Sequence, residues 1–273
     1  MKAIKLDELK KIECDILNYV DKICSKYGLQ YFVCGGTLLG AIRHDGFIPW
    51  DDDIDIQMPR KDYERLKQIV NTEKGYYKFF SMDNPDYYYV FGKLVDTRTK
   101  LIETKQKKSI EGLGICIDIF PLDGLPQNII MAERVFYKYR RNQKYLYNFN
   151  SIEFPELYNN IILNIKTIMY WGISKIHFLF LGENKLKFMI NKKITKYDYY
   201  KSRYVCNVGG RWGEKELYPS NWLLPVKRHK FENFMVNIPN MYHEYLCSMY
   251  GNYMELPPIK SRIPDHNFEA YWL

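Results

Sequence analysis

The sequence predicts a mixed fold, of class α/β or α+β, in which short apolar strands alternate with amphipathic helices. Three observations lead to this prediction. Residues 7–27 repeat an apolar side chain every three or four positions, as a helix with one buried face does. Residues 31–34 and 114–121 are short apolar runs, and residues 53–56 alternate acidic and apolar side chains, as buried strands do. With 273 residues and 47% hydrophobic content, the chain is long enough to bury a large core.

The first helix is expected over residues 7–27. Asp7 is suited to cap its beginning and Gly28 to end it. The side chains expected to face the core are Leu9, Ile12, Ile16, Val20 and Ile23. Charged residues occur throughout this segment, so it lacks the uninterrupted apolar stretch of a signal peptide. No stretch of the chain has the length of a clean membrane span, and we expect none.

Residues 31–43 predict a turn that binds phosphate. The apolar run at 31–34 is ended by Gly35 and Gly36, and a short helix is expected from Thr37 to about Arg43. Two glycines allow the backbone to approach a ligand closely, and their amide groups, together with the N-terminus of the helix, favour an anion. We therefore expect Gly35, Gly36 and Thr37 to bind phosphate oxygens of the substrate.

An acidic cluster follows, formed by Asp51, Asp52, Asp53 and Asp55. Because side chains alternate along a strand, Asp53 and Asp55 are expected on one face, with Ile54 and Ile56 toward the core. Carboxylates crowded on one face repel each other, so a divalent cation is the natural partner. The alternative is a solvated acidic turn, but the acids are interleaved with isoleucines. We expect Asp52 to face solvent.

The next elements are a helix and a meander of strands. Pro59 is expected to begin a helix that runs to about residue 71, and residues 76–103 have the composition of strands. Lys93 lies in an aromatic part of this meander. Two interpretations of Lys93 stay open: a surface charge that aids solubility, or a cation that holds phosphate oxygens.

The apolar strand at 114–121 contains one acid, Asp118. An ionised carboxylate in such a strand is costly to bury unless a cation meets it. Asp118 is therefore the candidate for a third metal-binding carboxylate beside Asp53 and Asp55, and a structural, hydrogen-bonded aspartate is the alternative. Asp123, which precedes a glycine, is expected in a turn.

The chain divides into three predicted parts: a catalytic core at 1–126, a helical lobe at 127–201, and a segment at 202–273 that completes the catalytic domain. Residues 161–181 form the most apolar part of the lobe. Two packed helices explain them, and a contact with a membrane surface is the alternative.

The C-terminal third is expected to form short strands over residues 231–238 and a helix over 241–250. The proline-rich residues 256–266 are too irregular for regular structure. Arg262 and His266 in this segment are candidates to fold over a phosphate.

Charge and cysteine content limit the classes of partner. The net charge of +8 favours anionic partners, such as nucleotides, phosphorylated glycans or an anionic membrane surface. No nucleic-acid partner is expected, because no zinc-finger spacing, RNA-recognition motif or dense basic block occurs. The six cysteines are scattered and none forms a C-x-x-C pair, which indicates free thiols in a cytoplasmic protein.

Several motifs together resemble the LicD family, and the resemblance covers nearly the whole chain. They are GGTLLGAIRHDGFIPWDDDIDI at 35–56, KLVDTRTKLIE at 93–103, IDIFPLDG at 117–124, FEN at 231–233 and YGNYMELPP at 250–258. Members are similar to enzymes of the nucleotidyltransferase fold. The resemblance thus implies an α+β fold, with a nucleotidyltransferase-like mixed sheet flanked by helices and an inserted or appended helical lobe.

The resemblance also implies an activity. Well-known bacterial members transfer phosphocholine from CDP-choline to cell-surface glycans, and fukutin-related members transfer ribitol phosphate from CDP-ribitol. Residue by residue, it implies metal ligation by Asp53, Asp55 and Asp118, an essential acid at Asp51, and phosphate contacts at Gly35, Gly36 and Arg43. The zinc-binding cysteines of the animal members are not evident, so no structural zinc is expected.

The resulting hypothesis is a transferase that uses Mg²⁺, or Mn²⁺ in its place. It would move a phospho-alcohol, phosphocholine above all, from a CDP-linked donor to a hydroxyl of a glycan or glycolipid such as lipopolysaccharide, teichoic acid or capsule, and release CMP. We expect it in the cytoplasm, and a contact to the inner face of the membrane through residues 161–181 stays open as an alternative. Two other classes stay open: a nucleotidyltransferase that moves NMP from an NTP to a small acceptor, and a glycan-binding protein without catalysis.

Overall fold

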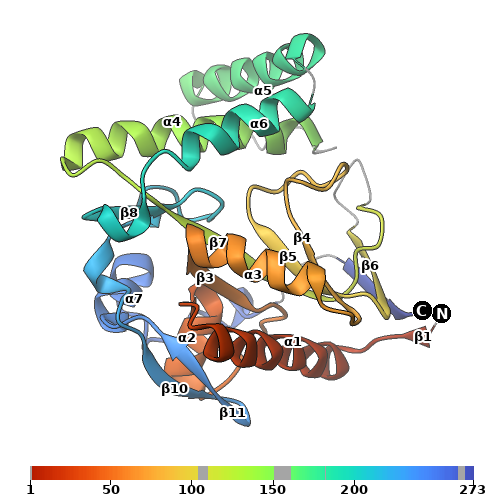
Figure 1. Cartoon of the computed structure of the whole chain (residues 1–273). Helices are drawn as coiled ribbons and strands as arrows, with labels where there is room; N and C mark the ends of the chain where they lie inside the picture. The colour runs from red at the N-terminus through yellow and green to blue at the C-terminus, as the bar shows by residue number, and fades with distance from the viewer. Residues whose placement is uncertain (1, 104–109, 151–160, 182, 264–267) are drawn as a thin grey trace.

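The computed structural model confirms the α+β class (Figure 1) and describes residues 2–103, 110–150, 161–181, 183–263 and 268–273. Its helices are α1 (Leu6–Tyr27), α2 (Gly35–His44), α3 (Arg60–Thr72), α4 (Ile129–Asn150), α5 (Ile161–Leu181), α6 (Glu183–Ile194) and α7 (Tyr242–Tyr250). Its strands are β1 (Lys2–Ala3), β2 (Phe32–Val33), β3 (Asp55–Pro59), β4 (Tyr77–Phe80), β5 (Gly92–Asp96), β6 (Thr99–Glu103), β7 (Cys116–Gly124), β8 (Tyr204–Asn207), β9 (Leu217–Pro219), β10 (Lys227–Phe231), β11 (Phe234–Ile238) and β12 (Phe268–Trp272).

A mixed sheet of seven strands forms the centre of the molecule. Five strands follow the order β2-β3-β7-β5-β4, and β8 and β9 extend the sheet from the far half of β7. The neighbours β3 and β7 run parallel, and the other pairs are antiparallel. Strand β7 is the longest, with nine residues, because its first half pairs with β5 and its last residues pair with β8. Strand β7 therefore pairs both with β5, which precedes it in the sequence, and with β8, which lies beyond residue 200.

The two faces of the sheet have different environments. Alternate residues such as Ile56, Ile117 and Ile119 are fully buried in the main core, which also contains the apolar stripe of α1 and the inner side of α3. Figure 1 shows α1 and α3 crossing in front of these strands. The intervening residues Asp55 and Asp118 point to the other face. Helices α1 and α3 thus cover one face, and Asp55 and Asp118 lie on the other.

Two strands near the termini were not predicted. Strand β12 pairs with both β6 and β1, so the two ends of the chain lie side by side (Figure 1). The prolines in residues 256–264 predicted an irregular segment, and the described part of it contains only η4, a short 3-10 turn at Ile259–Ser261. They gave no signal for a strand that depends on pairing with residues 99–103.

Three further local expectations are wrong. Lys5 precedes α1 and provides no side-chain cap, and Asp7 lies in the first turn instead. The strand expected at residue 53 begins at Asp55. Asp123 is not in a turn: it is buried within β7, and both its carboxylate oxygens accept hydrogen bonds from the Arg60 guanidinium, at 2.8 and 2.7 Å. An apolar strand can hold an acid when a partner with two donors meets it.

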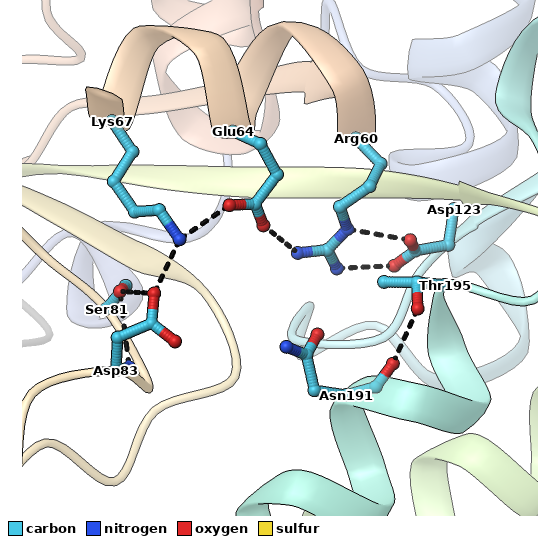
Figure 2. Close-up of polar contacts among 8 residues, drawn as sticks. All are labelled: Arg60, Glu64, Lys67, Ser81, Asp83, Asp123, Asn191 and Thr195. Carbon is cyan, nitrogen blue, oxygen red and sulfur yellow. Dashed lines mark hydrogen bonds and ion pairs between the residues drawn. The ribbon is translucent and has the colours of Figure 1, made fainter. Parts of the chain in front are cut away.

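Helices α4, α5 and α6 pack against each other, and Figure 1 shows them above the sheet. Figure 2 shows where α6 approaches the core: Asn191 of this helix and Thr195, which follows its last residue, lie beside the buried Arg60–Asp123 pair. Among the described residues, no helix is long and apolar enough to cross a membrane. The division at residues 126 and 201 stays a prediction.

Candidate active site

A cavity of about 830 Å³ opens on the acid-bearing face of the sheet. It is lined by the ends of β3, β5 and β7, by the N-terminus of α2, by residues 207–216, by α7 and by residues 260–263. Segments more than 150 residues apart in the sequence therefore contribute to one cavity. Seven of its residues are aromatic: Trp50, Tyr89, Phe91, Phe120, Trp212, Tyr245 and Tyr250.

Asp55 and Asp118 are neighbours at the floor of this cavity. They are register partners in the parallel pair of β3 and β7, so their side chains leave the same face of the sheet. The Asp118 amide donates to the Ile54 carbonyl at 2.9 Å, and the Asp55 amide donates to the Thr37 hydroxyl at 2.8 Å. Thr37 itself is buried and does not line the cavity, so it positions Asp55.

Asp51 and Asp53 also line the cavity, from the loop before β3. One carboxylate oxygen from each of Asp51, Asp52 and Asp53 lies within 4.8 Å of the other two. The expectation that Asp52 faces solvent is wrong: its side chain is 5% exposed, at a small hollow that it shares with Ile4 and residues of β12. Its burial depends on terminal segments that the sequence pattern did not identify as strands.

The carboxylates affect each other's protonation. Burial raises the pKa of Asp55 well above its usual value, and the charges of Asp53, Asp118 and Asp51 raise it further. A fifth carboxylate, Glu13 of α1, is 3% exposed, and burial together with the same acids raises its pKa. The Glu13 Oε2 atom has no hydrogen-bond partner. Such crowding is unfavourable unless protons or cations compensate for it.

Lys93 provides part of this compensation. Its ammonium donates to Asp118 Oδ1 at 2.7 Å, and β5 and β7 place the two residues in register. The ammonium also lies over the rings of Tyr89 and Phe91, at 5.0 and 5.5 Å from the ring centroids. Lys93 is thus a buried cation in the cavity wall, and it is not a solubilising surface charge.

The N-terminus of α2 borders the acids. Gly35 has φ of +54°, a conformation that favours glycine, and Gly36 approaches Asp51 so closely that an added Cβ would lie 2.6 Å from its Oδ2. Cys34, at the N-cap position, makes no side-chain cap to the first amides of the helix. The predicted phosphate-binding turn therefore lies in the cavity next to the acids.

Other predicted phosphate-binding residues lie elsewhere. Arg43 does not line the cavity: its guanidinium donates to the carbonyls of Tyr253 and Glu255, at 2.9 and 3.4 Å, and so holds the segment after α7. Arg262 donates to the Pro257 carbonyl and lies 5.5 Å from the ring of Trp50, at the edge of the cavity. His266 lies outside the described residues.

The sequence patterns missed the wall formed by residues 207–216 and α7. Gly209 approaches Phe91 and Phe120, while the buried Glu216 accepts hydrogen bonds from the Trp212 amide, at 3.3 Å, and from the Tyr218 hydroxyl. Trp212 and Tyr250 make an edge-to-face ring contact, with centroids 5.0 Å apart. The glycine pair at 209–210, followed by arginine and tryptophan, was the available signal, but only pairing of β8 with β7 places it at the site.

The residues present fit a divalent cation. Mg²⁺ and Mn²⁺ prefer oxygen ligands, and Asp51, Asp53, Asp55 and Asp118 supply carboxylate oxygens at one end of the cavity. Burial and the charges of Asp53, Asp118 and Asp51 together raise the pKa of Asp55 against the opposing charge of Lys93, so a cation at this place would relieve repulsion among the acids.

Comparisons with known proteins all point to one family. Residues 28–161 match the model for the nucleotidyltransferase domain of LicD/FKTN/FKRP proteins. The chain is 33% identical, over 281 residues and the full length of both proteins, to the lipopolysaccharide cholinephosphotransferase LicD of Haemophilus influenzae. It is 26% identical over 138 residues to the ribitol 5-phosphate transferase FKRP of Homo sapiens, which covers 50% of this chain and 23% of that protein. The residues matched by the family model include the glycine pair and the acids, and the full-length similarity to LicD shows that the chain belongs to the LicD family.

Proposed function

We propose that this protein transfers phosphocholine from CDP-choline to a hydroxyl of a cell-surface glycan or glycolipid and releases CMP. The observation that carries the proposal is the cavity, whose lining combines four aspartates, the glycine turn of α2 and seven aromatic residues. A nucleoside diphosphate that bears a cationic alcohol has chemistry that matches this lining. The full-length similarity to a lipopolysaccharide cholinephosphotransferase supports the same substrate pair.

The acidic end would hold the diphosphate through a cation. Mg²⁺ or Mn²⁺ on Asp53, Asp55 and Asp118, with Asp51 close by, would neutralise the diphosphate and the charge that develops as its bond to CMP breaks. The first amides of α2 would bind phosphate oxygens, since Gly35 and Gly36 let the backbone reach the ligand. Asp118 or Asp51 would accept the proton of the attacking hydroxyl.

The aromatic wall suits the quaternary ammonium of choline. Trp212 and Tyr250 line the cavity with their rings in contact, and Glu216, whose carboxylate accepts from the Trp212 amide, also lines it. Rings and a carboxylate together favour a cation that has no hydrogen to donate. Lys93 already covers Tyr89 and Phe91, so the choline subsite is expected at Trp212 and Tyr250.

The proposal is tested by product identity. The protein is incubated with Mg²⁺, lipopolysaccharide that lacks phosphocholine, and one of CDP-choline, CDP-ribitol, CDP-glycerol or CTP. We expect CMP release and choline incorporation with CDP-choline, and loss of both with EDTA. Pyrophosphate release from CTP would instead identify a nucleotidyltransferase, and CMP release from CDP-ribitol alone would identify a different alcohol.

Trp212→Ala is expected to weaken binding of CDP-choline by about tenfold, because a cation–π contact in a partly desolvated site contributes about 1–2 kcal/mol. Affinity for CMP, which lacks choline, should not change. Isothermal titration with both ligands in the presence of Mg²⁺ measures this difference. Phe188→Ala, which removes an exposed ring of α6 far from the cavity, is the matched control. An equal loss of CMP affinity would contradict a choline subsite at Trp212.

We further propose that the protein acts in the cytoplasm. All six of its cysteines are free thiols, and three of them are buried. A reducing compartment would keep them in this state.

A further inference from the structure

Helix α5 exposes apolar side chains where a helix of a soluble lobe normally exposes polar ones. Seven of the described residues of α5 are large, apolar and exposed, with exposed fractions from 43% to 78%. At 100° per residue, six of them fall within an arc of about 120° on one side of the helix, and Leu163 lies outside this arc. The six are Ile161, Ile162, Ile165, Ile168, Met169 and Ile176. We call this set the α5 stripe.

Another side of α5 is less exposed. Asn164, Thr167 and Trp171 fall within a separate arc and are only half exposed, and α5 packs against α4 and α6. Gly172 falls inside the arc of the α5 stripe, and an added Cβ at this position would meet no atom within 4 Å. The α5 stripe is thus an apolar surface of the helix that faces outward. Figure 1 shows α5 on the side of the lobe away from the sheet.

The charge of the protein is concentrated in the same lobe. Residues 127–201 contain 13 basic and 5 acidic residues, whereas the rest of the chain contains 27 of each. The whole net charge of +8 therefore belongs to the lobe. Lys166, which is exposed, lies at the edge of the α5 stripe.

We propose that the α5 stripe lies on the surface of an anionic lipid bilayer, with the basic residues of the lobe facing the lipid head groups. An apolar helix face flanked by basic residues inserts into the boundary between head groups and acyl chains, and anionic lipids attract the positive charge. A second copy of the chain is the poorer partner, because two lobes of equal positive charge repel each other. This inference goes beyond the proposed activity and does not depend on it.

The test is co-sedimentation of the full chain with vesicles. We expect binding to equimolar phosphatidylcholine and phosphatidylglycerol, weak binding to phosphatidylcholine alone, and a decrease on addition of salt. The variant I161Q/I165Q/M169Q should reduce the partition coefficient on anionic vesicles by at least about tenfold, since it removes apolar area from the contact. The control L6Q/M235Q/L273Q changes three exposed apolar residues outside the lobe and should bind as the wild type does.

A second variant separates the role of charge. K192Q/K193Q/K196Q should weaken binding to anionic vesicles by about tenfold or more and leave binding to neutral vesicles unchanged. Circular dichroism and the midpoint of thermal unfolding verify that each variant is folded. Absence of binding, equal binding to neutral vesicles, or an equal loss in the control variant would overturn the proposal. A dimer in analytical ultracentrifugation that the I161Q/I165Q/M169Q variant abolishes would also overturn it and assign the α5 stripe to a protein interface.

Discussion

Asp55→Asn is expected to abolish transfer while making the metal-free protein more stable. Activity should fall by a factor on the order of 10³ or more, because a ligand of the catalytic cation supplies several kcal/mol of charge stabilisation. Stability should rise because Asp55 is held among Asp51, Asp53 and Asp118, whose charges together with burial raise its pKa. Asparagine keeps the shape of the side chain and removes one of the repelling charges.

The difference in stability between Asp55→Asn and the wild type should depend on pH. A carboxyl whose pKa is higher in the folded than in the unfolded state binds its proton more tightly when folded, so ionising it destabilises the fold. The extra stability of Asp55→Asn should therefore be absent below the unfolded-state pKa, where the wild-type carboxyl is protonated in both states. It should grow as the pH rises from there to the folded pKa and stay constant above it. Thermal unfolding in EDTA across this range measures the difference.

Added Mg²⁺ should reverse the order of stability. The cation binds the folded wild type and raises its midpoint of unfolding, whereas the variant has lost a ligand. Asp15→Asn, which removes an exposed acid of α1 at some distance from the cavity, is the matched control and should alter neither activity nor the response to Mg²⁺. A variant that kept wild-type transfer rates would exclude Asp55 as a ligand.

The acidic end of the site follows from local patterns, and for this reason the sequence predicted its parts. Asp118 is an isolated acid in an apolar strand, and Asp55 belongs to an alternating segment, so each had to leave the core face of its strand. The parallel register that sets them side by side is consistent with both patterns. Whether these acids bind a metal stays a prediction.

The cavity wall formed by residues 207–216 and α7 could not be predicted in the same way. Residues 207–216 reach the cavity because β8 pairs with the last residues of β7, and α7 reaches it through packing. Long-range pairing leaves no periodicity in the local sequence. The burial of Asp52 has the same origin, since β12 and the segment after β1 form the hollow around it. Four acids near a turn are normally exposed to solvent. Asp52 is buried because the terminal strands pack over it.

Arg43 illustrates a different difficulty. An arginine in a glycine-rich phosphate-binding segment is readily interpreted as a phosphate ligand. In the structure, its guanidinium donates hydrogen bonds to the carbonyls of Tyr253 and Glu255. Burial and the charge of Arg262 lower its pKa. The sequence identified the residue type and its neighbourhood but not the direction of the side chain, which depends on a segment 210 residues away.

Asp123→Ala is expected to give the largest loss of stability, about 3–5 kcal/mol, because it leaves the Arg60 guanidinium buried without its partner. Arg60 and Asp123 are 12% and 1% exposed at the side chain, and two hydrogen bonds join them (Figure 2). Glu64 lies 3.5 Å from Arg60 but is more exposed, and it compensates less of the charge. Urea unfolding monitored by circular dichroism measures the loss.

Two further variants distinguish the loss of a buried partner from a general effect of removing charge. Lys61→Ala breaks the exposed pair of Lys61 and Asp198 and should cost at most about 1 kcal/mol. The double variant R60M/D123L replaces both buried charges by apolar side chains and should recover most of the stability lost in Asp123→Ala, since no unpaired charge remains. If the double variant were as unstable as Asp123→Ala, the pair would contribute through its specific hydrogen-bond geometry between α3 and β7, and the desolvation argument would be wrong.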